Sequence, residues 1–108
     1  MELLRGTLDL LILKTLSHGP LHGYGVSLAI RRATGDALQV DEGALYPALR
    51  RLEKRGLLEA EWRNSDTGRD AKFYELTPAG ESGLASEMSK WTRYVEAMAQ
   101  VLNEPARS

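Results

Sequence analysis

The chain has 108 residues, of which 43% are hydrophobic, and its formal net charge is −1. This length predicts one domain of ordinary size, and a core shared between two copies would help so short a chain to bury enough surface. The absence of cysteine excludes disulfides, thiolate zinc sites and cysteine nucleophiles, and it agrees with a cytoplasmic location. Bases outnumber acids between residues 50 and 72, which allows a nucleic-acid partner without requiring one.

The first predicted helix spans about Leu3 to Ser17. Its apolar run, Leu8 to Leu16, is too short to cross a membrane and contains charged residues, and the start lacks the features of a signal peptide. Apolar side chains cover two sides of this helix, so both sides must be buried. We expect one side to face its own domain and the other to face a second copy. The residues predicted to reach that copy are Leu4, Leu8 and Leu11.

The second predicted helix spans about His22 to Ala33, after a Gly-Pro pair at 19–20 that ends the first. Gly23 and Gly25 lie at its start and weaken it by up to about 1 kcal/mol each relative to alanine. They either permit the close approach of another backbone or mark a frayed first turn. The side chains expected to point inward are Tyr24, Leu28 and Ile30 or Ala33.

The third predicted helix lies in EGALYPALRRLEKRG, Glu42 to Gly56. Asp41 is the expected N-cap, because its carboxylate can accept from free amides of the first turn, and the closing glycine is a favourable stop. Pro47 fits if the helix begins late, near Gly43 or Ala44, since its missing N–H then falls among first-turn donors that have no partner. The predicted buried face consists of Leu45, Leu49 and Leu52.

Beyond this helix the apolar period changes to two, which predicts a β-hairpin with a polar, partly basic tip. In the first strand, Leu58, Ala60 and Trp62 alternate with charged residues, which predicts a half-buried strand. A turn-rich segment, Asn64 to Asp70, leads to a second strand over Ala71 to Leu76. The inward residues of that strand are expected to be Tyr74 and Leu76.

Thr77 and Pro78 open the last predicted helix, as N-cap and first helical residue. About 25 residues at 1.5 Å rise make a rod of roughly 37 Å. Its apolar residues recur at spacings of four and three, which is the a/d seam of a coiled coil and needs a partner surface. We expect that surface to belong to a second copy of the chain. The seam consists of Leu84, Met88, Trp91, Val95, Met98 and Leu102.

Three short helices, a two-stranded wing and a long helix make a winged helix-turn-helix protein, mainly α with a small β-hairpin. We predict that residues 1–76 form the winged helix-turn-helix DNA-binding domain. Residues 77–108 are then a C-terminal dimerisation helix.

The sequence argues against an enzyme and against a bound metal or cofactor. His18 and His22 are separated by Gly-Pro and have no evident third ligand. The serines at 27, 82 and 86 lack an adjacent base and orienting acid. Gly-Tyr-Gly at 23–25 does not match the spacing of a phosphate-binding loop.

Double-stranded DNA is the better predicted partner. A helix-turn-helix places the first turns of its second helix in the major groove, and its wing reaches the neighbouring backbone. Two alternatives stay open: Tyr46 either contacts bases or packs against the second helix, and each arginine either contacts DNA or belongs to a solvated face. The predicted DNA-binding residues are Tyr24, Glu42, Ala44, Tyr46, Pro47, Arg50, Arg51, Lys54, Arg69 and Lys72.

The segments GTLDLLILKTL, GPLHGYG, GALYPALRRLEKRGLL and AKFYELTPAG occur in this order, and over roughly residues 4–102 the chain resembles the PadR family of bacterial transcriptional regulators. It resembles the short subfamily, which has a single C-terminal helix. The resemblance implies a homodimer that binds palindromic promoter DNA, usually as a repressor relieved by a small molecule. In some short members a flat aromatic effector lies against a tryptophan at the dimer centre, which points to Trp91; the alternative is that Trp91 is ordinary dimer core.

The chain departs from the family pattern at several positions. The family usually has a small hydroxyl residue where Ala44 stands and an uncharged polar residue where Glu42 stands. Asp70 and Glu75 occupy wing positions where close relatives carry more base. Each change removes hydrogen-bonding capacity or adds repulsion against phosphate. Two other interpretations therefore stay open: a winged helix that binds a protein instead of DNA, and a ligand-binding module with its main chemistry in the dimer cavity.

Overall fold

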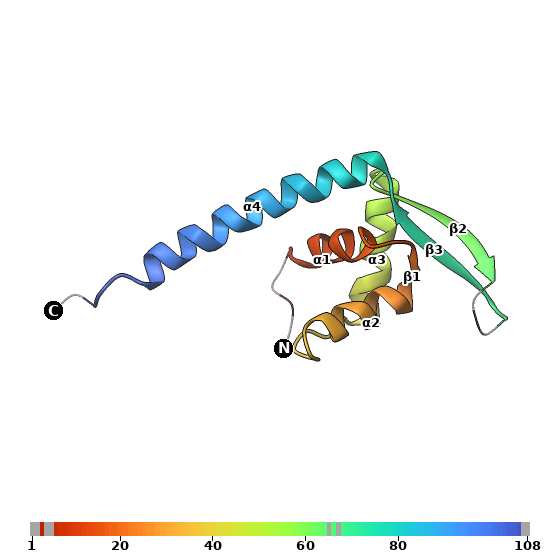
Figure 1. The fold of residues 1–108 in the computed structure, drawn as a ribbon, viewed down its shortest axis with the longest axis horizontal. Coiled ribbons are helices and arrows are strands. Elements are labelled where there is room, and N and C mark those ends of the chain that lie inside the picture. Colours follow the sequence, from red (N-terminus) through yellow and green to blue (C-terminus); the bar gives the residue numbers. More distant parts are fainter. Residues whose placement is uncertain (1–2, 4–5, 65, 67, 107–108) are drawn as a thin grey trace.

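The computed structural model describes residue 3, residues 6–64, residue 66 and residues 68–106. Three short helices form a body, a hairpin projects from one end of it, and a long helix projects from the other (Figure 1). This arrangement confirms the predicted winged helix-turn-helix fold with a long C-terminal helix. In chain order the elements are α1 (Leu8–Leu16), β1 (Leu21–His22), α2 (Gly23–Ala33), α3 (Glu42–Lys54), β2 (Leu58–Asn64), β3 (Asp70–Leu76) and α4 (Pro78–Leu102).

Helix α1 begins later than the sequence predicted. Gly6 has a φ of 85°, a left-handed conformation that cannot continue a helix, and Thr7 is the N-cap. Leu8 and Leu11, two of the residues predicted to reach a second copy, are half-buried. The third, Leu4, lies outside the described residues.

The core lies where α1, α2 and α3 meet one face of the hairpin. Leu45, Leu49 and Leu52 are 0% exposed, which confirms the predicted buried face of α3. In α2, Val26 and Ile30 are buried. The prediction that Tyr24 points inward is wrong: it lies in the first turn of α2, on the side away from these two residues, and is 57% exposed.

Pro47 lies deeper in α3 than predicted. The helix begins at Glu42 rather than near Gly43 or Ala44, so the proline falls in its second turn. Its missing N–H would have bonded to the carbonyl of Gly43, which therefore loses its intrahelical donor. Asp41 occupies the N-cap position as predicted, but its side chain makes no capping hydrogen bond.

The sheet has three antiparallel strands in the order β1-β3-β2, one more than predicted. The short strand β1 pairs Leu21 with Tyr74, and Tyr74 is buried as expected. The predicted half-burial of strand β2 holds at its start, where Leu58 is buried, but does not extend to Trp62, which is 70% exposed. The reason is that the hairpin extends past the body (Figure 1), and strand β2 is exposed from Glu61 to its end.

Helix α4 is fixed to the end of α3 by contacts that we call the α3–α4 joint: Gly56, Leu57, Thr77 and Gly80. The Thr77 hydroxyl accepts from the Gly80 N–H at 3.0 Å, which confirms the predicted N-cap, and donates to the Gly56 carbonyl at 2.6 Å. The Thr77 N–H donates to the Leu57 carbonyl at 3.1 Å. A Cβ on Gly80 would lie 2.1 Å from that same oxygen, so α4 packs directly on the backbone.

The rest of α4 leaves the body. A compact chain of this length would have a radius of gyration of about 13 Å, whereas the observed value is 16.3 Å and the molecule measures 65 × 29 × 21 Å. Figure 1 shows that the long helix accounts for this elongation. Only Gly80 and Leu84 of α4 are buried. Leu84, predicted as part of the dimer seam, therefore lies in the core of its own chain.

Candidate nucleic-acid interface

Helix α3 has one buried side and one exposed side. Leu45, Ala48, Leu49 and Leu52 are buried. All the α3 residues predicted to contact DNA are exposed, and together they form what we call the α3 outer face. Its members are Glu42, Ala44, Tyr46, Pro47, Arg50, Arg51 and Lys54. The structure thus brings these residues together on one surface, and their contact with DNA stays a prediction.

The basic side chains of this region differ in whether they already form an ion pair with an acidic side chain. Arg51 donates to Asp9 of α1, with 3.0 Å between Nη2 and Oδ1. Lys72 of the wing donates to Glu53, with 3.1 Å between Nζ and Oε1, and this hydrogen bond raises the pKa of Lys72 above its ordinary value. Arg50 and Lys54 have no acidic partner among the described residues. These two therefore present the most available positive charge of α3.

Tyr46 packs against the start of α2. A Cβ on Gly23 would lie 2.6 Å from Cε1 of Tyr46, so a larger residue at this position would displace the ring. The close approach predicted at Gly23 thus involves a side chain rather than a backbone. Tyr46 is nevertheless 42% exposed, so its outer edge is available to a partner.

The start of α2 is ordered by His22 rather than frayed. Its Nδ1 accepts from the Gly25 N–H at 2.9 Å, which makes the histidine a helix cap. Across the described part of the chain, no group of three or more His, Cys, Asp or Glu side chains is placed to hold a metal ion. Tyr24, two residues after His22, is exposed and lines one cleft together with Tyr46.

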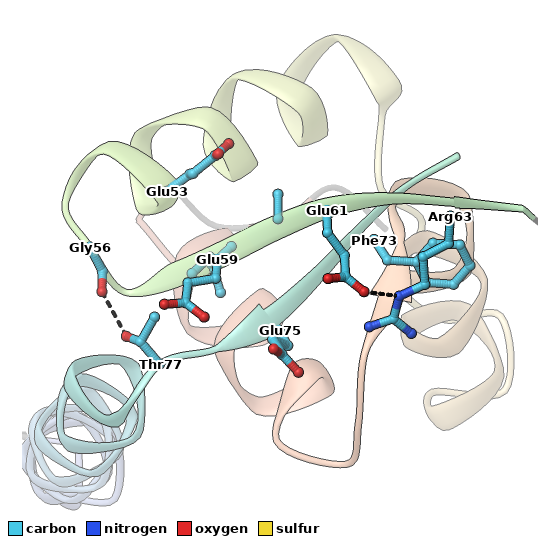
Figure 2. Close-up of a pocket in the computed structure, with 10 residues that line it drawn as sticks. Glu53, Gly56, Glu59, Glu61, Arg63, Phe73, Glu75 and Thr77 are labelled. Carbon is cyan, nitrogen blue, oxygen red and sulfur yellow. Dashed lines mark hydrogen bonds and ion pairs between the residues drawn. The ribbon is translucent and has the colours of Figure 1, made fainter. Parts of the chain in front are cut away.

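The wing has two faces of different chemistry. Trp62 and Lys72 are paired across the strands on what we call the inner face, which also carries Tyr74. The outer face borders a pocket of about 490 Å³ lined by Glu59, Glu61 and Glu75. Figure 2 shows these three glutamates on the two strands of the hairpin.

On the outer face, Glu59 and Glu75 lie directly opposite each other, a cross-strand pairing of like charges. Arg63 balances part of the negative charge, because its Nε lies 2.6 Å from Glu61 and its guanidinium 5.1 Å from the centre of the Phe73 ring. Glu75, one of the departures from the family pattern, thus belongs to an acidic surface on the side opposite Lys72. The second departure in the wing, Asp70, lies opposite Asn64 on the neighbouring strand, near the exposed tip and next to Arg69.

Helix α4 carries exposed apolar side chains that we call the α4 stripe. Trp91 and Tyr94 stack with their ring centres 6.3 Å apart. Soluble monomers rarely expose a contiguous apolar patch of this kind, which marks an interaction surface. The stripe consists of Met88, Trp91, Tyr94, Val95, Met98, Val101 and Leu102, each at least 40% exposed.

The fold and these surfaces define a winged helix-turn-helix protein. Residues 12–86 match the Transcriptional regulator PadR-like family. The chain therefore belongs to the PadR-like family of transcriptional regulators, as its sequence motifs predicted. Its place in the short subfamily stays a prediction.

The relatives and solved structures agree with this membership. A transcriptional regulator of Mycobacterium tuberculosis is 36% identical over 86 residues, which cover 80% of this chain and 77% of that protein. A PadR family regulator from Eggerthella lenta is similar in structure, with a TM-score of 0.81, 30% identity, and coverage of 94% of this chain and 86% of that one. A PadR family regulator from Clostridium difficile gives a TM-score of 0.76 at 29% identity, over 91% and 100% of the two chains.

Two features of these surfaces were missed by sequence reasoning. Trp62 was assigned to the half-buried side of its strand, although its alternation correctly placed it on the same face as Leu58 and Ala60. The close packing of Gly80 has only one signal in the sequence, its position three residues after the N-cap Thr77. Within the described ranges, no helix is long and apolar enough to cross a membrane.

Proposed function

We propose that this regulator is a homodimer that binds a palindromic promoter operator through α3 and the wing, with residues 1–76 contacting DNA and residues 77–108 joining the two copies. The observation that carries the proposal is the contrast between the two sides of α3. Its apolar side is completely buried, so the helix is held firmly. Its outer face offers Arg50 and Lys54 without acidic partners in the described chain. These two basic side chains suit contacts with phosphate. Tyr46 and Pro47 lie nearer the start of α3, which is the end expected to face the nucleobases in the major groove.

Dimerisation through α4 completes the proposal. The α4 stripe begins where the helix leaves its own core and continues to Leu102. Burying these side chains against the same stripe of a second copy follows from their heptad spacing. The half-buried Leu8 and Leu11 of α1 would extend that interface. Two copies would then present two α3 helices to two half-sites of the operator.

A small aromatic effector is the proposed regulator of this dimer, and relief of repression is the proposed outcome. Trp91 and Tyr94 already stack on the exposed side of α4, so two such pairs facing each other would offer a flat aromatic surface. The repressor role follows from the family resemblance, and the proposed cytoplasmic location agrees with the absence of cysteine from the sequence. Trp91 as ordinary dimer core is the alternative.

Fluorescence anisotropy tests the proposal. The purified protein is titrated onto labelled DNA from upstream of its own gene and onto a scrambled duplex of equal length, across a salt series. We expect tighter binding to the upstream DNA, with the logarithm of affinity falling by about 0.9 per phosphate contact per decade of salt. Absence of binding to either duplex at low salt would contradict DNA recognition. The acidic outer face of the wing would then become the surface to test for a basic protein partner.

A further inference from the structure

The inner face of the wing borders a cleft. It lies between the start of α2, Tyr46 of α3 and the hairpin, has a volume of about 340 Å³, and is called the wing cleft here. Three aromatic side chains line it while staying open to solvent: Trp62 is 70% exposed, Tyr24 57% and Tyr46 42%. Burying a large apolar side chain stabilises a protein by about 1.5–3 kcal/mol. Trp62 is largely exposed, so it gains little of this stabilisation.

The wing cleft lacks the negative charge that the outer face of the wing carries. Among the described residues that line it, none is acidic, and Lys72 is the only lysine or arginine. The charge of the Lys72 ammonium is balanced by Glu53, 3.1 Å away, and the ammonium lies 5.5 Å from the centre of the Tyr74 ring. The pocket on the opposite face of the same hairpin is lined by several glutamates instead. A polyanion would therefore approach the wing from its inner face and not from its outer face.

The chemistry of the lining also fits a sugar–phosphate strand. Tyrosine hydroxyls and the indole N–H can donate hydrogen bonds to phosphate oxygens. The flat faces of the same rings can pack on the apolar side of a deoxyribose. Figure 1 shows the hairpin projecting beside β1 and the start of α2. With α3 in the major groove and the wing over the adjacent groove, the strand that separates the two grooves has to pass between α3 and the wing.

We propose that the wing cleft binds this sugar–phosphate strand, with Trp62 packed on deoxyribose and the hydroxyl of Tyr24 donating to phosphate, while Tyr46 forms the α3 side of the cleft. The inference rests on the proposed function and adds Trp62 to the residues that contact DNA. Because contacts with the sugar–phosphate backbone carry no sequence information, this contact should strengthen binding to any duplex. Because the indole carries no charge, it releases no counterion and leaves the salt dependence of binding unchanged.

The test compares Trp62→Ala with Glu61→Gln, which changes the neighbouring residue on the opposite face of the same strand. Binding of each variant is measured by anisotropy on the upstream and the scrambled duplex, across salt. Trp62→Ala should weaken binding to both duplexes by about tenfold, without altering the salt slope. Glu61→Gln should leave affinity unchanged or slightly improve it. Trp62 is largely exposed, so its variant should melt at the same temperature as the wild type.

A second readout follows the side chain itself. The chain has two tryptophans, so Trp91→Phe leaves Trp62 as the sole tryptophan, whose fluorescence is excited selectively over that of the tyrosines. Bound duplex should protect this indole from acrylamide quenching, whereas Trp91 in Trp62→Phe should show no such protection. Wild-type affinity in Trp62→Ala together with unprotected Trp62 would overturn the inference and leave the proposed function intact. If the wild type binds no duplex at low salt, the proposed function fails, and the inference fails with it.

Discussion

Helices α3 and α4 are both amphipathic, yet the chain covers their apolar sides to different extents. In α3, Leu45, Leu49 and Leu52 are 0% exposed. In α4, the stripe from Met88 to Leu102 is at least 40% exposed at every member. The remaining free surface of α3 is polar and partly basic, whereas the free surface of α4 is apolar.

The difference shows how one kind of periodicity serves two purposes. Apolar residues at helical spacing predict a helix and its apolar side, but they do not say which surface covers that side. When the same chain covers it, the helix interacts with partners through its polar side, as proposed for α3. When the same chain leaves it open, the helix interacts through its apolar side, as proposed for α4.

The largest expected effect comes from a charge in the α4 stripe. Met98→Glu should weaken the dimer by roughly 100-fold or more, because a carboxylate buried without a partner costs about 3 kcal/mol or more. Sedimentation velocity over a concentration series measures this. The fold should be retained, since Met98 is 43% exposed and lies outside the core cluster.

Gln100→Glu is the matched control, because it adds the same charge to the same helix outside the stripe. It should sediment as the wild type does. A Met98→Glu protein that dimerises with wild-type affinity would mean that the α4 stripe is covered by something other than a second copy, and the comparison with α3 would have to be redrawn.

An intermediate effect is expected at the point where α4 is anchored to its own chain. Gly80→Ala would place a Cβ 2.1 Å from the Leu57 carbonyl oxygen, and the forced shift should lower the free energy of unfolding by about 1–3 kcal/mol. Urea unfolding measures the change. Gly83→Ala is the control: its Cβ would lie 3.5 Å from Cδ2 of Leu57, an ordinary contact, so the better helix former should raise stability by up to about 1 kcal/mol. Equal changes in both variants would contradict a close contact that is specific to Gly80.

The smallest effect separates two neighbouring arginines on the α3 outer face. Arg50→Ala should weaken duplex binding about fivefold and lower the salt slope by about 0.9, because the Arg50 guanidinium has no acidic partner and is expected to contact phosphate. Arg51→Ala should have a smaller effect, since Arg51 already donates to Asp9. Anisotropy titrations at several salt concentrations measure both variants. The reverse order of effects would show that the Arg51–Asp9 pair opens on DNA.

The features predictable from the sequence are those determined within one element. The leucines of α3 repeat at helical spacing, and Thr77 with Pro78 marks the start of α4, so both helices were predicted. The predicted and observed helices differ at their starts, which the sequence marks less clearly. Helix α3 begins before Gly43, which places Pro47 in its second turn. The two residues of β1 are too few to show an alternation.

Features that depend on distant segments could not be predicted in the same way. The alternation in β2 placed Trp62 on the right face, but its burial depends on how far the body extends along the hairpin. The Arg51–Asp9 pair joins residues 42 positions apart. The sequence does not decide between packing and DNA contact for Tyr46, whose ring lies against Gly23 while 42% of the residue stays exposed.

The α3–α4 joint has a consequence for the geometry of an assembled dimer. Helix α4 has 25 residues and acts as a lever about 37 Å long at 1.5 Å per residue, so a tilt of about 5° at the joint moves its far end by about 3 Å. If two such levers are held together along their length, the same tilt changes the separation of the two α3 helices. The stiffness that Thr77 and Gly80 give to this joint would thus set how much variation in half-site spacing the dimer tolerates.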